Sequence, residues 1–160
     1  MPVFAAEVFY TGSVGLGLLM SSLGAGSVIG TLLLASLGDV KRKGRLITVA
    51  VVCTGCAMLG FSFVRSLAWA LPALALVSVG MMLFFAETSA LIQSIVSDEF
   101  RGRVSSLYSL TFGALPVGSF LAGSMAQKLG APSATLIASV VLVSAALMFT
   151  LWNRALWRAG

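Results

Sequence analysis

Two long segments without a single charged residue, 13–37 and 46–64, flank a short basic segment with the sequence GDVKRKGR at residues 38–45. A helix needs about 20 residues, each rising ~1.5 Å, to cross ~30 Å of hydrocarbon, and an apolar run of more than ~18 residues marks a candidate span. Both segments pass that test. The pattern therefore predicts two membrane-spanning helices joined by a basic turn.

The composition supports an integral membrane protein and excludes several other classes. Of the 160 residues, 59% are hydrophobic and 9% are charged, which leaves too few charges to cover a soluble globule. The net charge of +5 does not indicate a nucleic-acid partner, because eight of the ten bases lie at the ends of apolar runs and form no basic face. The lipid bilayer is the expected partner.

Three further apolar runs, 67–96, 104–126 and 133–151, give an all-α fold of about five transmembrane helices. Alternating these spans across the membrane puts eight bases on one side and two on the other. Because Lys and Arg concentrate in cytoplasmic loops, we expect a multi-pass plasma (inner) membrane protein with its amino terminus outside and its carboxy terminus in the cytoplasm. The larger set is Lys41, Arg42, Lys43, Arg45, Arg101, Arg103, Arg154 and Arg158, and the smaller is Arg65 and Lys128.

Small residues in the first span, Ser22, Gly26 and Gly30, recur every four positions and share one helical face. Small residues let two helices approach closely in lipid, so this face is a predicted packing seam, against another span or a partner chain. Cys53 and Cys56 have a redox-like spacing, but mid-span, in a chain without histidine, they are interpreted as small apolar filler.

Glu87 is the one acid well inside an apolar run. Its distance along the third span, about 14 Å from Ser97, suggests a position near mid-bilayer. An ionisable group at that depth is costly and marks a candidate functional site, where it would carry a proton or line a cavity. The alternative is internal packing, with the carboxyl group hydrogen-bonded to a neighbouring helix.

Pro116 and Gly118 lie in the middle of the fourth predicted span. A proline there removes a backbone hydrogen bond and should kink the helix. Bent helices of this kind serve flexing in transporters, but static packing explains them equally well.

The segment 92–123, IQSIVSDEFRGRVSSLYSLTFGALPVGSFLAG, resembles the loop between the tenth and eleventh helices, and the eleventh helix itself, of major facilitator superfamily transporters. The pattern is most similar to that of exporters related to the enterobactin exporter and the macrolide efflux proteins, although Ser97 replaces the usual proline. The matching positions are Gln93, Asp98, Glu99, Arg101, Gly102, Arg103, Val104, Ser106, Leu107, Tyr108, Pro116, Gly118 and Gly123.

GDVKRKGR resembles the loop between helices eight and nine of the same superfamily, with Ala35 in place of its first glycine and two extra residues before Gly44. The resemblance implies that two charged loops act as cytoplasmic gate elements and that Gln93 joins Glu87 in the cavity. The implied gate residues are Asp39, Arg42, Gly44, Arg45, Asp98, Glu99, Arg101, Gly102 and Arg103.

Residues 1–160 therefore resemble a partial major facilitator domain, about helices eight to twelve of twelve. The implied function is secondary active transport, expected to be proton-driven export of a small amphipathic molecule such as a drug or siderophore. The implied partners are that substrate and either the missing amino-terminal helices or another copy of the chain. The alternative is a non-transporting truncated fragment or helix-packing subunit. No enzyme activity, cofactor or metal is expected, because the chain lacks histidine and clustered carboxylates.

Overall fold

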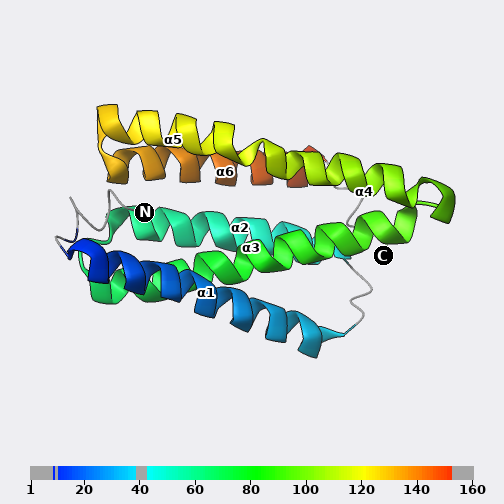
Figure 1. Ribbon diagram of the computed structural model, residues 1–160, viewed down its shortest axis with the longest axis horizontal. Coiled ribbons are helices and arrows are strands. Elements are labelled where there is room, and N and C mark those ends of the chain that lie inside the picture. The colour runs from blue at the N-terminus through cyan, green and yellow to red at the C-terminus, as the bar shows by residue number, and fades with distance from the viewer. Residues whose placement is uncertain (1–8, 10, 39–42, 153–160) are drawn as a thin grey trace.

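The computed structural model describes residues 9, 11–38 and 43–152, and within these ranges every element is a helix. Figure 1 shows the helices running roughly along one long direction. Asp39 and Arg42, and the bases Arg154 and Arg158 near the carboxy terminus, lie outside the described residues. The helices are α1 (Gly12–Leu37), α2 (Lys43–Phe63), α3 (Leu67–Ile95), α4 (Asp98–Gly113), α5 (Leu115–Leu129) and α6 (Ala131–Trp152).

Within the described residues, five helical segments are long and apolar enough to cross a membrane, which confirms the predicted all-α membrane fold. The fourth of these segments, Glu99–Leu129, consists of α4 and α5 together. The helix is interrupted at Ala114, and Pro116 follows in the first turn of α5. A proline is well tolerated in a first turn, where its missing N–H would have no helical partner.

Two helices begin earlier than the sequence suggests. Residues 98–103, expected as a loop, form the first turns of α4, and Gly44 and Arg45 lie in the first turn of α2. Asp98 and Glu99 favour this start, because negative charge near a helix amino terminus interacts well with the helix dipole. The connection between α3 and α4 is therefore only two residues long.

The predicted packing seam at Ser22, Gly26 and Gly30 is confirmed, and its partner is α3 of the same chain. A β-carbon added to Gly26 would lie 2.3 Å from the carbonyl oxygen of Ala75, so the two backbones are in direct contact. Ser22 donates a hydrogen bond to the carbonyl oxygen of Leu71. The small residues thus bring α1 close enough to α3 for polar contacts between helices.

The other face of α3 packs against α2, and α2 in turn packs against α6. A β-carbon on Gly80 would lie 2.0 Å from Thr54 Oγ1, and one on Gly55 would lie 2.4 Å from Cγ2 of Val143 on α6. Finally, α6 packs against α5. Close glycine contacts therefore hold both α1–α3 and α2–α3 together, as lipid-embedded helices require.

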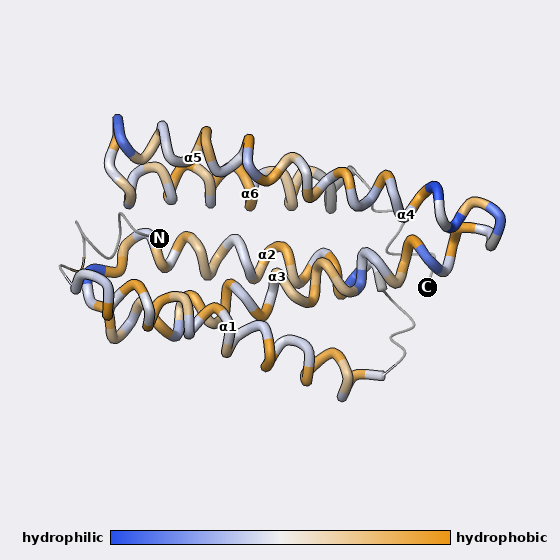
Figure 2. The backbone as a smooth tube through the Cα atoms, in the orientation of Figure 1, coloured by the Kyte–Doolittle hydropathy of each residue, from blue (hydrophilic) through white to orange (hydrophobic). Residues whose placement is uncertain are grey.

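The hydrophobic core of the bundle lies where α2 ends and where α1, α3 and α6 begin. Its buried apolar residues are Leu19, Phe61, Ala70, Leu74 and Ala131. By contrast, no residue of α5 is buried, and Phe120 on α5 is 74% exposed. Figure 2 shows hydrophobic residues along the whole length of the helices and hydrophilic ones concentrated at their ends. That distribution fits a bundle whose outer surface contacts lipid.

Candidate functional site

Glu87 on α3 is buried, with 5% of its surface exposed. Its carboxyl oxygen Oε2 is inaccessible to solvent and has no hydrogen-bond partner, and the hydroxyl oxygen of Thr88 beside it has none either. Among the bases whose side chains the structure describes, none forms an ion pair with Glu87. A buried polar group without a partner is unfavourable, and an ionisable residue within a spanning helix is a candidate functional site.

The contact between α2 and α3 gives the level of Glu87 in the bundle. The two helices are antiparallel, and Gly80 lies against Ala50 and Thr54. Glu87 is seven residues farther along α3, about 10 Å by helical rise, which places it at the level of the first turns of α2. Glu87 therefore lies nearer the Arg45 end of the bundle than the mid-bilayer position that its distance along α3 suggested. Figure 1 shows α3 continuing past this end of α2.

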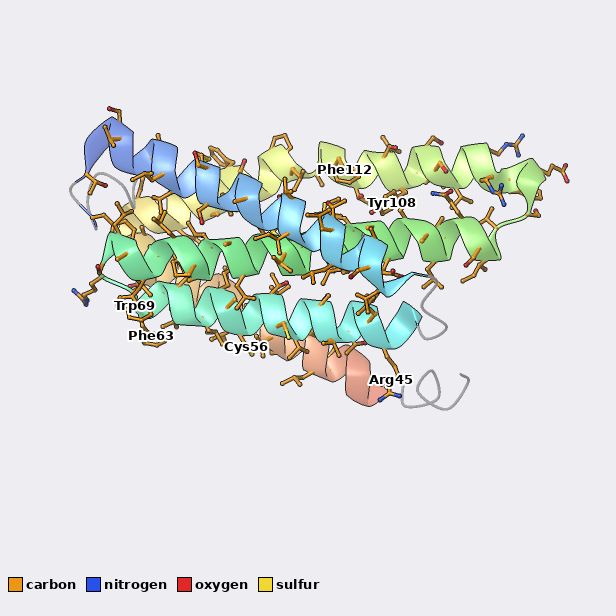
Figure 3. The ribbon with its side chains drawn as sticks, turned by 90° about the horizontal axis from the view of Figure 1, so that it is seen from below. Arg45, Cys56, Phe63, Trp69, Tyr108 and Phe112 are labelled. Carbon is orange, nitrogen blue, oxygen red and sulfur yellow. The ribbon has the colours of Figure 1, made fainter. Side chains whose placement is uncertain are left out.

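Four aromatic rings form a group at the turn of α3 that precedes Glu87 and Thr88, two from α3 itself and two from α4. The ring centroids of Phe84 and Phe85 are 5.5 Å apart, and those of Phe85 and Phe112 are also 5.5 Å apart. Tyr108 completes the group, with its ring 5.6 Å from that of Phe112 and its hydroxyl donating a 3.4 Å hydrogen bond to the carbonyl oxygen of Phe85. Figure 3 shows Tyr108 and Phe112 on α4 beside α3. We call these four residues the aromatic cluster.

The end of the α3–α4 hairpin is held by a polar contact that joins two predicted site residues. Arg101 donates a 3.3 Å hydrogen bond from Nη2 to the carbonyl oxygen of Gln93. The side chain of Gln93 is exposed and donates a 3.1 Å hydrogen bond to Ser89 Oγ. The structure thus places Gln93 about two turns from Glu87, at the rim of the hairpin.

The remaining predicted site residues lie apart from Glu87. Glu99, Gly102 and Arg103 are exposed in the first turns of α4, and Gly44 and Arg45 are exposed in the first turn of α2. Pro116 and Gly118 lie in α5, beyond the interruption at Ala114. Cys53 and Cys56 are exposed and unpaired on α2. No cluster of potential metal ligands occurs in the part of the chain that the structure describes.

Sequence reasoning missed the aromatic cluster as a unit. Tyr108 was identified only as a match to the family pattern, and Phe112 was not identified as a site residue. The adjacent pair Phe84 and Phe85, one turn before the buried Glu87, was the available signal. The contribution from α4 could not be found from spacing, because more than 20 residues separate Tyr108 from Phe85.

Comparison with known proteins identifies the family. The family model described as transmembrane secretion effector, a group of the major facilitator superfamily, matches residues 1–158. Comparisons with curated proteins and with solved structures found no match. The match covers nearly the whole sequence and agrees with the five helices, in the described part of the chain, that are long and apolar enough to span a membrane. The chain therefore belongs to the transmembrane secretion effector family of major facilitator transporters.

Proposed function

We propose that this chain is part of a proton-driven exporter of a small amphipathic molecule and that Glu87 carries the proton. The observation that supports this role is the burial of its carboxyl group, whose Oε2 has no hydrogen-bond partner among the described side chains. Protonation neutralises the group and removes the cost of burying a charge. Loss of the proton restores that cost, so the two protonation states favour different arrangements of the helices around α3.

The interruption at Ala114 supplies a place where the arrangement changes. On one side of it, α4 contacts α3 through the aromatic cluster, and on the other side, α5 packs against α6. Because few contacts join α4 to α5, we propose that the α3–α4 hairpin moves as a unit against α5 and α6. Pro116 and Gly118 assist by keeping the junction from forming a continuous rigid helix.

Transport also needs a second half. In transporters built from two repeats, the substrate binds at the interface between them, so one set of five helices does not enclose a cavity. We propose that the exposed apolar surface of α4 and α5 contacts the other helices of the complete transporter or another copy of this chain. The charged segments 39–45 and 98–103 then act as gate elements on the cytoplasmic side.

The proposed orientation follows from the bases. Arg65 lies between α2 and α3 and Lys128 near the end of α5, at one end of the bundle, whereas Arg45, Arg101 and Arg103 lie at the other. We assign the second end to the cytoplasm, because basic loops favour that side. A plasma membrane location and an outside amino terminus complete the proposal.

The competing function is a non-transporting membrane fragment or helix-packing subunit, in which Glu87 serves internal packing only. The close α1–α3 contact at Gly26 favours it, because these helices pack within the chain without needing other helices.

Efflux of a fluorescent amphipathic drug from cells separates the two functions. Three forms are compared: this chain alone, the complete transporter that contains it, and the complete transporter with Glu87→Gln. We expect export only from the unmodified complete transporter. Export that continues unchanged with Glu87→Gln rules out the proton role, and a complete transporter that never exports supports the packing subunit.

A further inference from the structure

We propose that Tyr108 is the positioning residue that keeps α4 attached to α3 while the hairpin moves, because its hydroxyl group has two alternative partners on α3. In this structure the partner is the carbonyl oxygen of Phe85. In the second arrangement the partner is the hydroxyl group of Thr88, about one turn farther along the helix. The inference rests on the proposed function, because it assumes that the hairpin moves during transport.

The backbone of α4 is held loosely by the rest of the bundle. The helices α1 and α2 approach the backbone of α3 closely, at Gly26 and at Gly80. By contrast, α4 makes few close backbone contacts with any other helix among the described residues, and it ends at the interruption at Ala114. The side chains of α4 therefore determine where this helix lies beside α3.

Two side chains of α4 contact α3 at the same residue, Phe85. The ring centroid of Phe112 lies 5.5 Å from that of Phe85. The ring of Tyr108 packs against Phe112, and its hydroxyl group donates a 3.4 Å hydrogen bond to the carbonyl oxygen of Phe85. Hydroxyl donors usually form hydrogen bonds of about 2.7–2.8 Å, so this long bond opens at a lower cost than a short one.

The second partner is a buried hydroxyl group that this arrangement leaves without a hydrogen bond. Oγ1 of Thr88 is inaccessible to solvent and has no partner. Thr88 follows Phe85 by three residues, so the two lie on the same side of α3. The carbonyl group of Phe85 points along the helix toward the N–H of Ser89, which places its oxygen beside the turn that carries Thr88. The hydroxyl group of Tyr108 therefore reaches Thr88 after a short movement of α4.

Exchange between the two partners leaves no new polar group unpaired. When Tyr108 leaves the carbonyl oxygen of Phe85, that oxygen keeps its helical hydrogen bond from the N–H of Ser89. Thr88 gains the hydrogen bond that it lacks here, and the hydroxyl group of Tyr108 is bonded in both arrangements, as a buried polar group requires. The two arrangements therefore differ little in hydrogen bonding, so a small bias selects between them.

Carbon NMR of tyrosine isotopically labelled at Cζ reports the hydrogen bonding of this hydroxyl group in the purified complete transporter. The signal of Tyr108 is the one that Tyr108→Phe removes. We expect separate signals for the two partners. Thr88→Val should leave only the signal of the state bonded to Phe85, and Thr88→Ser, which retains a hydroxyl group, should keep both. A Tyr108 signal that is identical with and without Thr88→Val overturns the inference.

Ser109→Ala is the matched control for these spectra. Ser109 is exposed next to Tyr108, and its hydroxyl group is hydrogen-bonded within α4, to the carbonyl oxygen of Ser105. The substitution should leave the Tyr108 signals unchanged.

The rate of substrate export by the complete transporter supplies a second readout. Tyr108→Phe keeps the ring and removes the hydroxyl group, so it should slow export by about threefold to twentyfold, the range for one hydrogen bond between helices in lipid. Thr88→Val should also slow export. The double variant should be no slower than Tyr108→Phe alone, because both substitutions remove the same hydrogen bond. Additive losses would show that the two hydroxyl groups act independently, which overturns the inference.

These outcomes separate the role of Tyr108 from the proton role of Glu87. If the Tyr108 signals respond to Thr88→Val but Glu87→Gln leaves proton-driven export unchanged, the positioning role stands and the proton role fails. If Glu87→Gln abolishes proton-driven export but Tyr108→Phe leaves the export rate unchanged, the proposed function stands and the positioning role fails.

Discussion

Replacing Gly26 by alanine tests the close packing of α1 on α3. The added β-carbon would lie 2.3 Å from the carbonyl oxygen of Ala75, 2.8 Å from its Cα and 2.9 Å from its carbonyl carbon. All three are backbone atoms, so no side-chain rotation relieves the contact. Separation to 3.0 Å, below which real β-carbons essentially never approach other atoms, requires the helices to move apart by at least 0.7 Å.

Gly24 on the same helix is the matched control, because a β-carbon there meets nothing within 4 Å. Both substitutions gain the same helix propensity, about 1 kcal/mol in alanine's favour, so that effect cancels when the two are compared. Overpacking in a well-packed contact costs about 1–3 kcal/mol. We therefore expect Gly26→Ala to be less stable than Gly24→Ala by about 1–3 kcal/mol.

The separation would also affect the neighbouring hydrogen bond between Ser27 Oγ and Ser78 Oγ, which is 2.8 Å long. Unfolding of the purified protein in mixed micelles, titrated with a denaturing detergent, gives the difference in free energy. Stabilities of the Gly26 and Gly24 variants that agree within about 0.5 kcal/mol, the usual effect of a neutral surface substitution, would refute the close contact of α1 and α3.

Three further predictions concern other parts of the bundle. Glu87→Met should raise the free energy of unfolding in micelles by about 1–3 kcal/mol, because it removes a buried polar group without a partner; a lower stability would contradict the assigned burial. Ser78→Ala should lower the free energy of unfolding by about 0.6–1.7 kcal/mol, because Ser78 Oγ is hydrogen-bonded both to Ser27 Oγ and to the carbonyl oxygen of Leu23 on α1. Ser94→Ala is the control: it loses only a hydrogen bond within α3 and should change the stability little. Pro116→Ala restores a backbone N–H near the interruption and should slow amide hydrogen exchange at residues about 112–118; unchanged exchange would show that proline does not set the break.

The spans could be predicted from the sequence because each depends only on length and composition. Residues 13–37 and 46–64 lack charge throughout, and lipid requires every spanning segment to satisfy its backbone polar groups as a helix. The seam at Gly26 was also predictable, since spacing by four residues defines a helical face before any partner is known.

Helix starts and non-local contacts were harder to predict. Residues 98–103 carry four charges and were expected as a loop, but the same acids stabilise a helix amino terminus. The burial of Glu87 followed from its apolar surroundings, whereas its level in the bundle depends on the register of α2 against α3. The aromatic cluster depends on how α4 returns along α3, and no local periodicity encodes that contact.

The proposed function requires that the movement of protons be coupled to the movement of substrate. The most direct measurement uses the complete transporter in sealed vesicles, with a pH-sensitive dye inside and a substrate gradient as the only driving force. We expect protons to move in the direction opposite to the substrate. We expect that movement to be lost with Glu87→Gln although the protein remains folded. Proton movement of unchanged size with Glu87→Gln would contradict it.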